Sequence, residues 1–229
     1  MNSDLSPDNK RKLLDHLLGF ASDNKNNLFE KVIRYRTRYI TVVLEDLYQS
    51  HNASAVLRTC DCFGIQDVHI IESNNKFEIN PDVALGSTKW LNLLKYSNDE
   101  TNTLHAFKRL KTQGYRIVAT TPYKNDCNLE ELNLDSKIAL VFGTELNGLS
   151  EEAIKYADEF VKIPMYGFTE SFNISVSAAI ILHYLTEKLR ASDQSWKLNE
   201  EEIIDVKLNW VKNVVKSSGM IEKRLFKNS

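Results

Sequence analysis

The sequence predicts an α/β protein with a mostly parallel sheet and helices on both faces. Short apolar runs rich in β-branched residues, the first at 40–46 (ITVVLED), alternate with longer helical patterns. The runs do not alternate polar and apolar residues, which is typical of strands buried on both faces. Polar clusters follow three of the runs, and ligands of such sheets bind at the carboxyl ends of strands. These observations predict both the fold class and the edge of the sheet that carries the site.

The first predicted helix begins at Ser6, an N-cap residue followed by Pro7 at the first helical position. Its leucines recur at helical spacing, at Leu13, Leu14, Leu17 and Leu18. A second short helical pattern contains Leu28, Val32 and Ile33, and a basic segment at 31–39 (KVIRYRTRY) completes this region. We therefore expect a helical, basic stretch before the first strand.

The α/β pattern then runs from residue 40 to about residue 190. Predicted strands lie at 40–46, 67–72, 115–121, 138–142 and 159–164. Predicted helices lie at 52–63, 103–113, 150–158 and 173–190, and Gly64 and Gly114 close the first two. In the first of these helices we expect an apolar face of Ala55, Val56, Thr59 and Phe63. A final amphipathic helix at 201–219 repeats apolar residues at Ile203, Val206, Trp210 and Val214.

Composition excludes several classes of protein. The chain has 229 residues, 42% of them hydrophobic, and contains no apolar run of eighteen or more, so no transmembrane helix is expected. The beginning (MNSDLSPDNKRKLLDHLL) is too polar for a signal peptide. Cys60, Cys62 and Cys127 form no CxxC pair, which favours a reducing cytoplasm over disulfides or a zinc site. Cys60 and Cys62 are expected to be buried as small hydrophobic side chains.

The charge distribution is uneven. The net charge is −2, yet residues 1–40 carry eight lysines and arginines against five acidic residues, and residues 207–229 carry six against one. Basic ends around an acidic middle indicate terminal segments that contact a polyanion such as RNA. The alternative is that these lysines only keep the ends soluble.

The segment 143–150 (GTELNGLS) differs by one residue type from a nucleotide-binding P-loop. The P-loop lysine is replaced by Leu149, and a carboxylate, Glu145, lies inside the would-be phosphate cradle. Because a carboxylate repels a polyphosphate, the sequence favours a ligand that is neutral or cationic where it touches this loop, or an ordinary turn between strand and helix. No GxGxxG follows the first strand, so a Rossmann cofactor site is not supported either.

Three motifs, each at a strand end, resemble those of the SpoU/TrmH family of RNA ribose 2′-O-methyltransferases in the knotted SPOUT class. The first is NASAVLRT at 52–59, the second GTELNGLS at 143–150, and the third IPM at 163–165 with SFNISVS at 171–177. The resemblance spans about residues 40 to 190. It implies S-adenosylmethionine as the methyl donor, whose sulfonium is cationic and needs no lysine beside it.

The resemblance also implies architecture and partners. It suggests a catalytic domain at 40–190 with a deep trefoil knot in its C-terminal part, a helical basic extension at 1–39, a second at 191–229, and a homodimer. The short extensions are similar to those of family members that methylate the ribose of a D-loop guanosine in tRNA. We therefore expect a cytoplasmic tRNA methyltransferase.

The motifs assign candidate catalytic roles by position, to Arg58, Asn52, Glu145, Ser171 and Asn173. Arg58 is expected to be exposed on its helix, and it would either remove the hydroxyl proton or, since a guanidinium is a poor base, hold a neighbouring phosphate. Asn52 is expected at the N-cap of that helix and Asn173 at the N-cap of the last one. Glu145 would fix its loop or the partner's arginine.

Candidate cofactor contacts follow from the family's spacing and fall on Thr120, Gly143, Ile163 and Phe172. Phe172 stands where the family usually has leucine, and it would form an apolar wall against adenine. His51 and His69 lack partners at metal-ligand spacing, so we expect no metal and treat both as structural.

Two other functions stay open. One is the same chemistry on ribosomal RNA, favoured if removing the basic ends left activity intact. The other is a non-catalytic RNA-binding factor on the same fold, favoured if the protein bound RNA but not the methyl donor.

Overall fold

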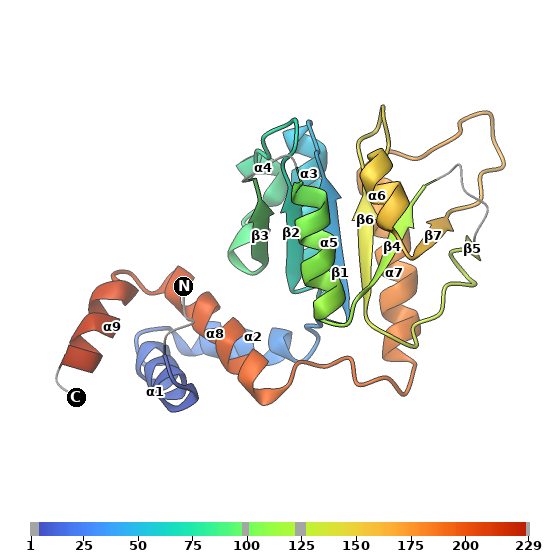
Figure 1. The fold of residues 1–229 in the computed structure, drawn as a ribbon. Helices are drawn as coiled ribbons and strands as arrows, with labels where there is room; N and C mark the ends of the chain where they lie inside the picture. Colours follow the sequence, from blue (N-terminus) through green and yellow to red (C-terminus); the bar gives the residue numbers. More distant parts are fainter. Residues whose placement is uncertain (1–4, 98–100, 122–126, 228–229) are drawn as a thin grey trace. The chain divides into compact units, whose positions relative to one another are not determined.

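The computed structural model describes residues 5–97, 101–121 and 127–227, and the chain divides into two compact units. The larger, from Thr37 to Trp196, is the α/β unit. The smaller combines the residues up to Arg36 with those from Lys197 onwards, and we call it the helical unit. Figure 1 shows the elements of both units.

The α/β unit is built on a seven-stranded sheet in the order β3-β2-β1-β6-β4-β7-β5, and every strand pairing is parallel. The strands are β1 (Ile40–Glu45), β2 (Asp67–Ile71), β3 (Asn92–Tyr96), β4 (Arg116–Thr120), β5 (Cys127–Asn128), β6 (Ile138–Phe142) and β7 (Glu159–Lys162). The two central strands, β1 and β6, are buried along their whole length. The predicted α/β class with a mostly parallel sheet is confirmed.

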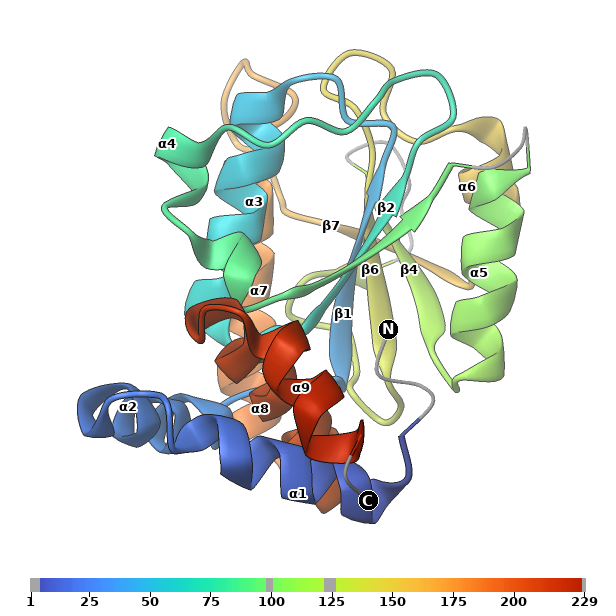
Figure 2. The ribbon, with the colours of Figure 1, turned by 90° about the vertical axis from the view of Figure 1, so that its left-hand side faces the viewer.

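Two helical layers cover the sheet (Figure 2). The helices of the unit are α3 (Ser50–Phe63), α4 (Pro81–Ala84), the 3-10 helix η1 (Ser87–Lys89), α5 (Asn102–Thr112), α6 (Glu151–Tyr156) and α7 (Ile174–Arg190). Val42 and Leu44 of β1 pack in one apolar cluster with residues of α3 and α7. Val43 packs in a second cluster with residues of α5 and α6. Because neighbouring side chains of β1 enter opposite cores, its apolar run needs no alternation.

The helical unit joins four helices from the two ends of the sequence. They are α1 (Pro7–Leu18), α2 (Asp23–Ile33), α8 (Glu200–Val214) and α9 (Ser218–Lys227). Ser6 caps α1 as predicted, since its hydroxyl accepts from the backbone N–H of Asn9. Lys10 forms an ion pair with Asp205 of α8 at 2.8 Å, and Phe29 of α2 packs against Trp210 with ring centroids 5.5 Å apart. The two ends therefore share one small core.

Two cations of the basic segment at 31–39 have structural roles. Arg36 is only 2% exposed, and its guanidinium lies 5.3 Å from the centre of the Trp210 ring, within cation–π range. Arg38 forms an ion pair with Asp67 at 3.0 Å. Lys31 and Arg34 are exposed. Of the four cations in this segment, only Lys31 and Arg34 are therefore open to a polyanion.

The structure adds elements that the sequence patterns did not reveal, namely β3, β5, α4, η1 and α9. It also corrects two expectations about burial. Cys62 is exposed although Cys60 is buried, and all three cysteines are free thiols. The buried face of α3 is centred on Ala53, Val56, Leu57 and Cys60, because Ala55, Thr59 and Phe63 are only partly buried. Among the described helices, none is long and apolar enough to cross a membrane.

His69 on β2 makes the stability of the α/β unit depend on pH. The side chain is 2% exposed, and its Nδ1 lies 2.9 Å from the hydroxyl of Tyr96. Burial, reinforced by the charge of Arg109, lowers the pKa of His69 from 6.5 to about 4. Between about pH 4 and pH 6.5 the unfolded chain therefore binds a proton that the folded chain excludes.

We expect the free energy of unfolding to rise by up to about 3 kcal/mol between pH 4 and pH 6.5 and to level off above that. Urea unfolding at half-unit pH steps would measure this rise. His69→Asn does not titrate, so it should remove this part of the pH dependence. An unchanged slope in that variant would assign the effect to other groups.

Candidate active site

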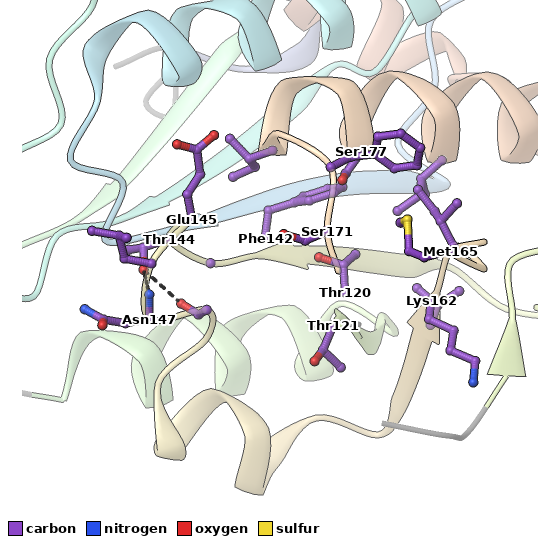
Figure 3. A pocket seen from close by; sticks show the side chains of 18 residues that line it. Thr120, Thr121, Phe142, Thr144, Glu145, Asn147, Lys162, Met165, Ser171 and Ser177 are labelled. Carbon is purple, nitrogen blue, oxygen red and sulfur yellow. Dashed lines mark hydrogen bonds between the residues drawn. The ribbon is translucent and has the colours of Figure 1, made fainter. Parts of the chain in front are cut away.

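The three motif segments meet at the carboxyl ends of the central strands, where a pocket opens beside β6. We call it the β6 pocket. Its floor is apolar and includes Phe142, Val161 and Ile181. Figure 3 shows Glu145 at one end and Lys162 and Met165 at the other. The remaining lining residues are Thr120, Thr121, Gly143, Thr144, Leu146, Asn147, Gly148, Ile163, Ser171, Phe172, Ile174 and Ser177.

The loop at 143–150 closes on itself. The backbone N–H of Thr144 donates to the carbonyl of Gly148 at 2.8 Å, and the N–H of Gly148 donates back at 3.0 Å. The N–H of Asn147 donates to the hydroxyl of Thr144 at 3.0 Å. A P-loop turns such N–H groups towards phosphate, whereas three of them here bond within the loop. The P-loop reading is therefore excluded by geometry as well as by charge.

Gly143 is required by this turn. A Cβ atom at this position would lie 2.2 Å from the carbonyl oxygen of Gly148 and 2.4 Å from its carbonyl carbon. Those atoms belong to the backbone of the returning strand of the loop, so a side chain cannot be accommodated by a rotamer change. The backbone at Gly148 can approach residue 143 this closely only because residue 143 is glycine.

The loop is anchored where it leaves the pocket by Glu45, a carboxylate at the end of β1 that is only 3% exposed. The backbone N–H and the hydroxyl of Ser150 donate to Glu45 at 2.9 and 2.8 Å. The hydroxyl of Thr103 donates to it at 2.7 Å. Ser150 also caps α6, because its hydroxyl accepts from the N–H of Ala153 at 3.0 Å. Three donors satisfy the buried charge and fix the exit of the loop.

The polar side chains of the motifs are joined in one hydrogen-bonded chain. Asn173 donates through Nδ2 to Glu145 at 2.6 Å and to the side-chain oxygen of Asn52 at 3.2 Å. Asn52 in turn donates to Gln49 at 2.6 Å. The oxygen of Asn173 accepts from the N–H and the hydroxyl of Ser175 at 2.9 and 2.6 Å, which fixes the orientation of its amide. All three motifs thus contribute residues to a single network.

The structure corrects the expected role of Asn52 at the start of α3. Gln49 is the N-cap residue, and the helix begins at Ser50, so Asn52 lies in the first turn. The residue is 7% exposed, and its amide bonds to Gln49 and Asn173 instead of capping the helix. Asn173, by contrast, is the N-cap of α7 as predicted.

Arg58 lies apart from this network. It is exposed, as expected, but it does not line the β6 pocket. Six residues separate it from Asn52, which places it about 9 Å further along the axis of α3 and on a different face of the helix. Among the described residues, Arg58 neither lines the β6 pocket nor takes part in the hydrogen bonds that join Asn52, Glu145 and Asn173.

The sequence profile of the SpoU rRNA methylase family matches residues 39–183, which include all three motifs. The chain belongs to this family.

Individual relatives extend the similarity to both ends of this SpoU-family chain. The tRNA (guanosine(18)-2′-O)-methyltransferase of Borreliella burgdorferi is 48% identical over 215 residues, which cover 94% of this chain and 97% of the relative. The crystal structure of the Aquifex aeolicus TrmH/SpoU tRNA modifying enzyme superposes with a TM-score of 0.75 at 31% identity, covering 85% of this chain and 98% of that one.

A more distant structure shows the same fold. The SpoU methyltransferase AviRb from Streptomyces viridochromogenes, in complex with the cofactor AdoMet, superposes with a TM-score of 0.60 at 20% identity. The match covers 71% of this chain and 62% of that one.

All the predicted residues of the SpoU-family site except Arg58 either line the β6 pocket or belong to the hydrogen-bonded network that includes Glu145. The four candidate cofactor residues, Thr120, Gly143, Ile163 and Phe172, all line the β6 pocket, as do Glu145 and Ser171. Asn173 is hydrogen-bonded to both Glu145 and Asn52. Arg58 is exposed and does not line the pocket.

Sequence reasoning missed Gln49 and Glu45. Glu45 ends the first strand and Gln49 lies in the polar stretch that follows it, but neither residue has a distinctive spacing there. Across 5–97, 101–121 and 127–227, no three histidine, cysteine, aspartate or glutamate side chains gather closely enough to hold a metal ion.

Proposed function

We propose that the protein transfers a methyl group from S-adenosylmethionine to the ribose 2′-OH of guanosine 18 in the D-loop of tRNA. The similarity to the Borreliella enzyme over nearly the whole length of both chains carries this proposal. The name of the matching family refers to rRNA, and ribosomal RNA is therefore the second candidate substrate.

The β6 pocket suits the methyl donor. Its apolar floor offers a surface for the adenine, and Phe172 and Ile163 add apolar walls. The loop at 143–150 presents Glu145 and no lysine, which favours a cationic group over a phosphate. The donor supplies a methyl group bound to a positively charged sulfur. Thr120, Gly143, Ile163 and Phe172 are the residues we propose to hold it.

Asn173, Asn52 and Glu145 would position the reacting groups. Asn173 donates to Glu145 at 2.6 Å, so one carboxylate oxygen is held and the other can meet a cation or a hydroxyl. Ser171 lines the pocket close to Asn173 in sequence and would contribute to its shape. Arg58 would hold the phosphate next to the acceptor ribose and stabilise the oxygen as it loses its proton.

Because Arg58 lies apart from the pocket of its own chain, we propose that it completes the site of a second subunit. This arrangement requires a homodimer. Glu145, exposed at the rim of the pocket, would then be a partner for the incoming guanidinium. We also propose the family's trefoil knot in the C-terminal part of the α/β unit, and a cytoplasmic location with tRNA. The order of the strands, in which β6 lies between β1 and β4, is compatible with a knot.

The proposal is tested by incubating the purified protein with labelled S-adenosylmethionine and unmodified tRNA transcripts. Label should enter the ribose of guanosine 18, and a transcript with 2′-deoxyguanosine at that position should accept none. Label that enters rRNA transcripts but not tRNA would support the proposed methyl transfer and show that ribosomal RNA is the substrate. Binding of RNA without binding of the methyl donor would support the non-catalytic function.

The helical unit is the proposed tRNA-binding region. Seven of its cations are exposed and form no ion pair within the described part of the chain, namely Lys12, Lys31, Arg34, Lys216, Lys223, Arg224 and Lys227. Replacing Lys216, Lys223 and Arg224 with alanine should weaken tRNA binding and lower the slope of log affinity against log salt by up to about 3. Filter binding at several salt concentrations measures both effects.

The matched control removes three lysines from the α/β unit, Lys108, Lys137 and Lys155. It should leave the salt dependence almost unchanged, and affinity for S-adenosylmethionine should be equal in both triple variants. An equal loss of tRNA affinity in both would indicate a general effect of net charge.

A further inference from the structure

We propose that the surface between Tyr48 and Glu78 is the subsite for the guanine base of the acceptor nucleotide, where Tyr48 stacks on the base and Glu78 reads its Watson–Crick edge. We call this surface the base subsite and define it by Tyr48, Gln49, Asn75, Lys76 and Glu78. The inference rests on the proposed function and adds the residues that would select guanosine.

The loop at 143–150 lies between the base subsite and the β6 pocket. A second pocket shares Ile174 and the whole of the loop at 144–147 with the β6 pocket, so this loop separates the two. This second pocket is closed on its far side by Tyr48, Gln49 and Asn75. The same three residues border a third hollow, which reaches Lys76 and Glu78. The three adjoining pockets therefore form a continuous surface from the proposed methyl-donor pocket, past Glu145, to Glu78.

Methyl transfer fixes which side the acceptor must occupy. The ribose oxygen attacks in line, from the side opposite the leaving sulfur, so the donor and the acceptor need adjoining pockets with a common boundary. The base is attached to the carbon next to the one that carries the 2′-OH. A ribose at the Glu145 boundary therefore places its base within one nucleoside length, on the side of Tyr48.

Two loops form the walls of the base subsite, and Asp46 ties them together. Its carboxylate accepts from the backbone N–H groups of Ser73, Asn74 and Asn75 at 3.1, 2.7 and 2.8 Å. Asn75 donates back to the carbonyl of Asp46 at 3.1 Å. Burial raises the pKa of Asp46, but these hydrogen bonds outweigh it and lower the pKa overall. Asp46 itself has φ +57°, a left-handed conformation that a non-glycine residue keeps only where its surroundings enforce it.

The loop that carries Glu78 is fixed on both sides of that residue. Phe77 is buried, and its N–H donates to Glu72 at 2.8 Å. The N–H of Asn80 donates to the hydroxyl of Ser54 on α3 at 2.8 Å. Lys76 and Glu78 remain exposed between these anchors. The loop is therefore prepared to present a carboxylate without reorganising on binding.

The side chains match guanine. Tyr48 is 77% exposed, and it makes no hydrogen bond or ring contact within the part of the chain that the structure describes. An exposed aromatic ring beside an RNA site is a stacking platform for a base. Guanine carries two adjacent donors, N1–H and N2–H₂, and a carboxylate can accept both. Glu78 is exposed, lines the third hollow and forms no ion pair among the described residues, so its oxygens are open to such a base.

The experiment compares two tRNA transcripts that differ only at the acceptor position, one with guanosine and one with inosine, which lacks the N2 amino group. The wild-type protein should prefer guanosine in kcat/KM by about 10-fold or more, because a site that accepts from an amino group rejects the analogue without it. Glu78→Gln should lose about 10-fold on guanosine and bring the ratio of the two transcripts close to 1.

Tyr48→Ala should lower kcat/KM on both transcripts by about 10-fold, and Tyr48→Phe should restore it, because phenylalanine keeps the stacking face. Asp82→Asn removes an exposed carboxylate four residues from Glu78, and it should behave as wild type. The affinity for S-adenosylmethionine, measured by calorimetry, should be the same in all variants.

A guanosine-to-inosine ratio that persists in Glu78→Gln, or full activity in Tyr48→Ala, would overturn the inference while leaving the proposed function in place. A wild-type protein that methylates neither tRNA transcript would instead remove the proposed function, and this inference with it.

Discussion

Replacing Arg58 with alanine is expected to reduce kcat for tRNA methylation by about two to four orders of magnitude. The side chain is exposed on α3 and does not line the β6 pocket, so the variant should fold normally and bind S-adenosylmethionine with unchanged affinity. Arg58→Lys keeps the charge but loses the bidentate geometry, and only a small part of the activity should return. Rapid-mixing measurements with saturating tRNA would separate this effect from weaker binding.

The same variant tests which subunit supplies the arginine. If Arg58 acts in the partner's site, inactive Arg58→Ala chains mixed with inactive Asn173→Ala chains form hybrid dimers with one complete site. An equal mixture should then regain about a quarter of the wild-type activity after the subunits exchange. A mixture that stays inactive, although exchange is shown by mass spectrometry, would place Arg58 in the site of its own chain.

Gly143→Ala is expected to abolish binding of S-adenosylmethionine. The added methyl group would lie 2.2 Å from the carbonyl oxygen of Gly148, so the backbone of the loop must move away. This movement breaks the pair of hydrogen bonds between Thr144 and Gly148 and displaces Glu145. We expect the free energy of unfolding to fall by about 1–3 kcal/mol, the usual cost of overpacking. Calorimetry with the methyl donor and urea unfolding measure the two effects.

Gly219→Ala is the matched control for this substitution. Gly219 lies in α9, and a Cβ atom there would meet nothing within 4 Å. Alanine should leave donor binding unchanged and stabilise the helix slightly. Wild-type affinity in Gly143→Ala would show that the closed form of the loop is not needed to hold the donor.

The sequence was informative where several weak signals agreed. Apolar runs predicted β1, β2, β4, β6 and β7, and the polar clusters after three of those runs meet at one edge of the sheet. The shorter strands escaped prediction for a physical reason. β5 has two residues, and β3 is only partly buried, so neither carries a hydrophobic run that differs from a loop.

The site was predictable by residue but not by geometry. Spacing identified Asn173 and Glu145, but only the fold shows that they are 2.6 Å apart. The start of α3 was misplaced because Gln49 is a poor N-cap residue, and Asn52 is a good one that serves the network instead. Arg36 could not be distinguished from its exposed neighbours, since its burial depends on Trp210, which is 174 residues away in the sequence.

The shared core of the helical unit has a consequence for synthesis. α1 and α2 leave the ribosome long before α8, yet Phe29 and Arg36 are covered by Trp210 of α8. The N-terminal helices must therefore wait, without their apolar partners, while the whole α/β unit is translated and folds. Cations spread over both ends come together only when translation has passed Trp210. A nascent chain should thus form its methyl-donor pocket before it can bind RNA. Shortened products that end before α8 should not compete for tRNA.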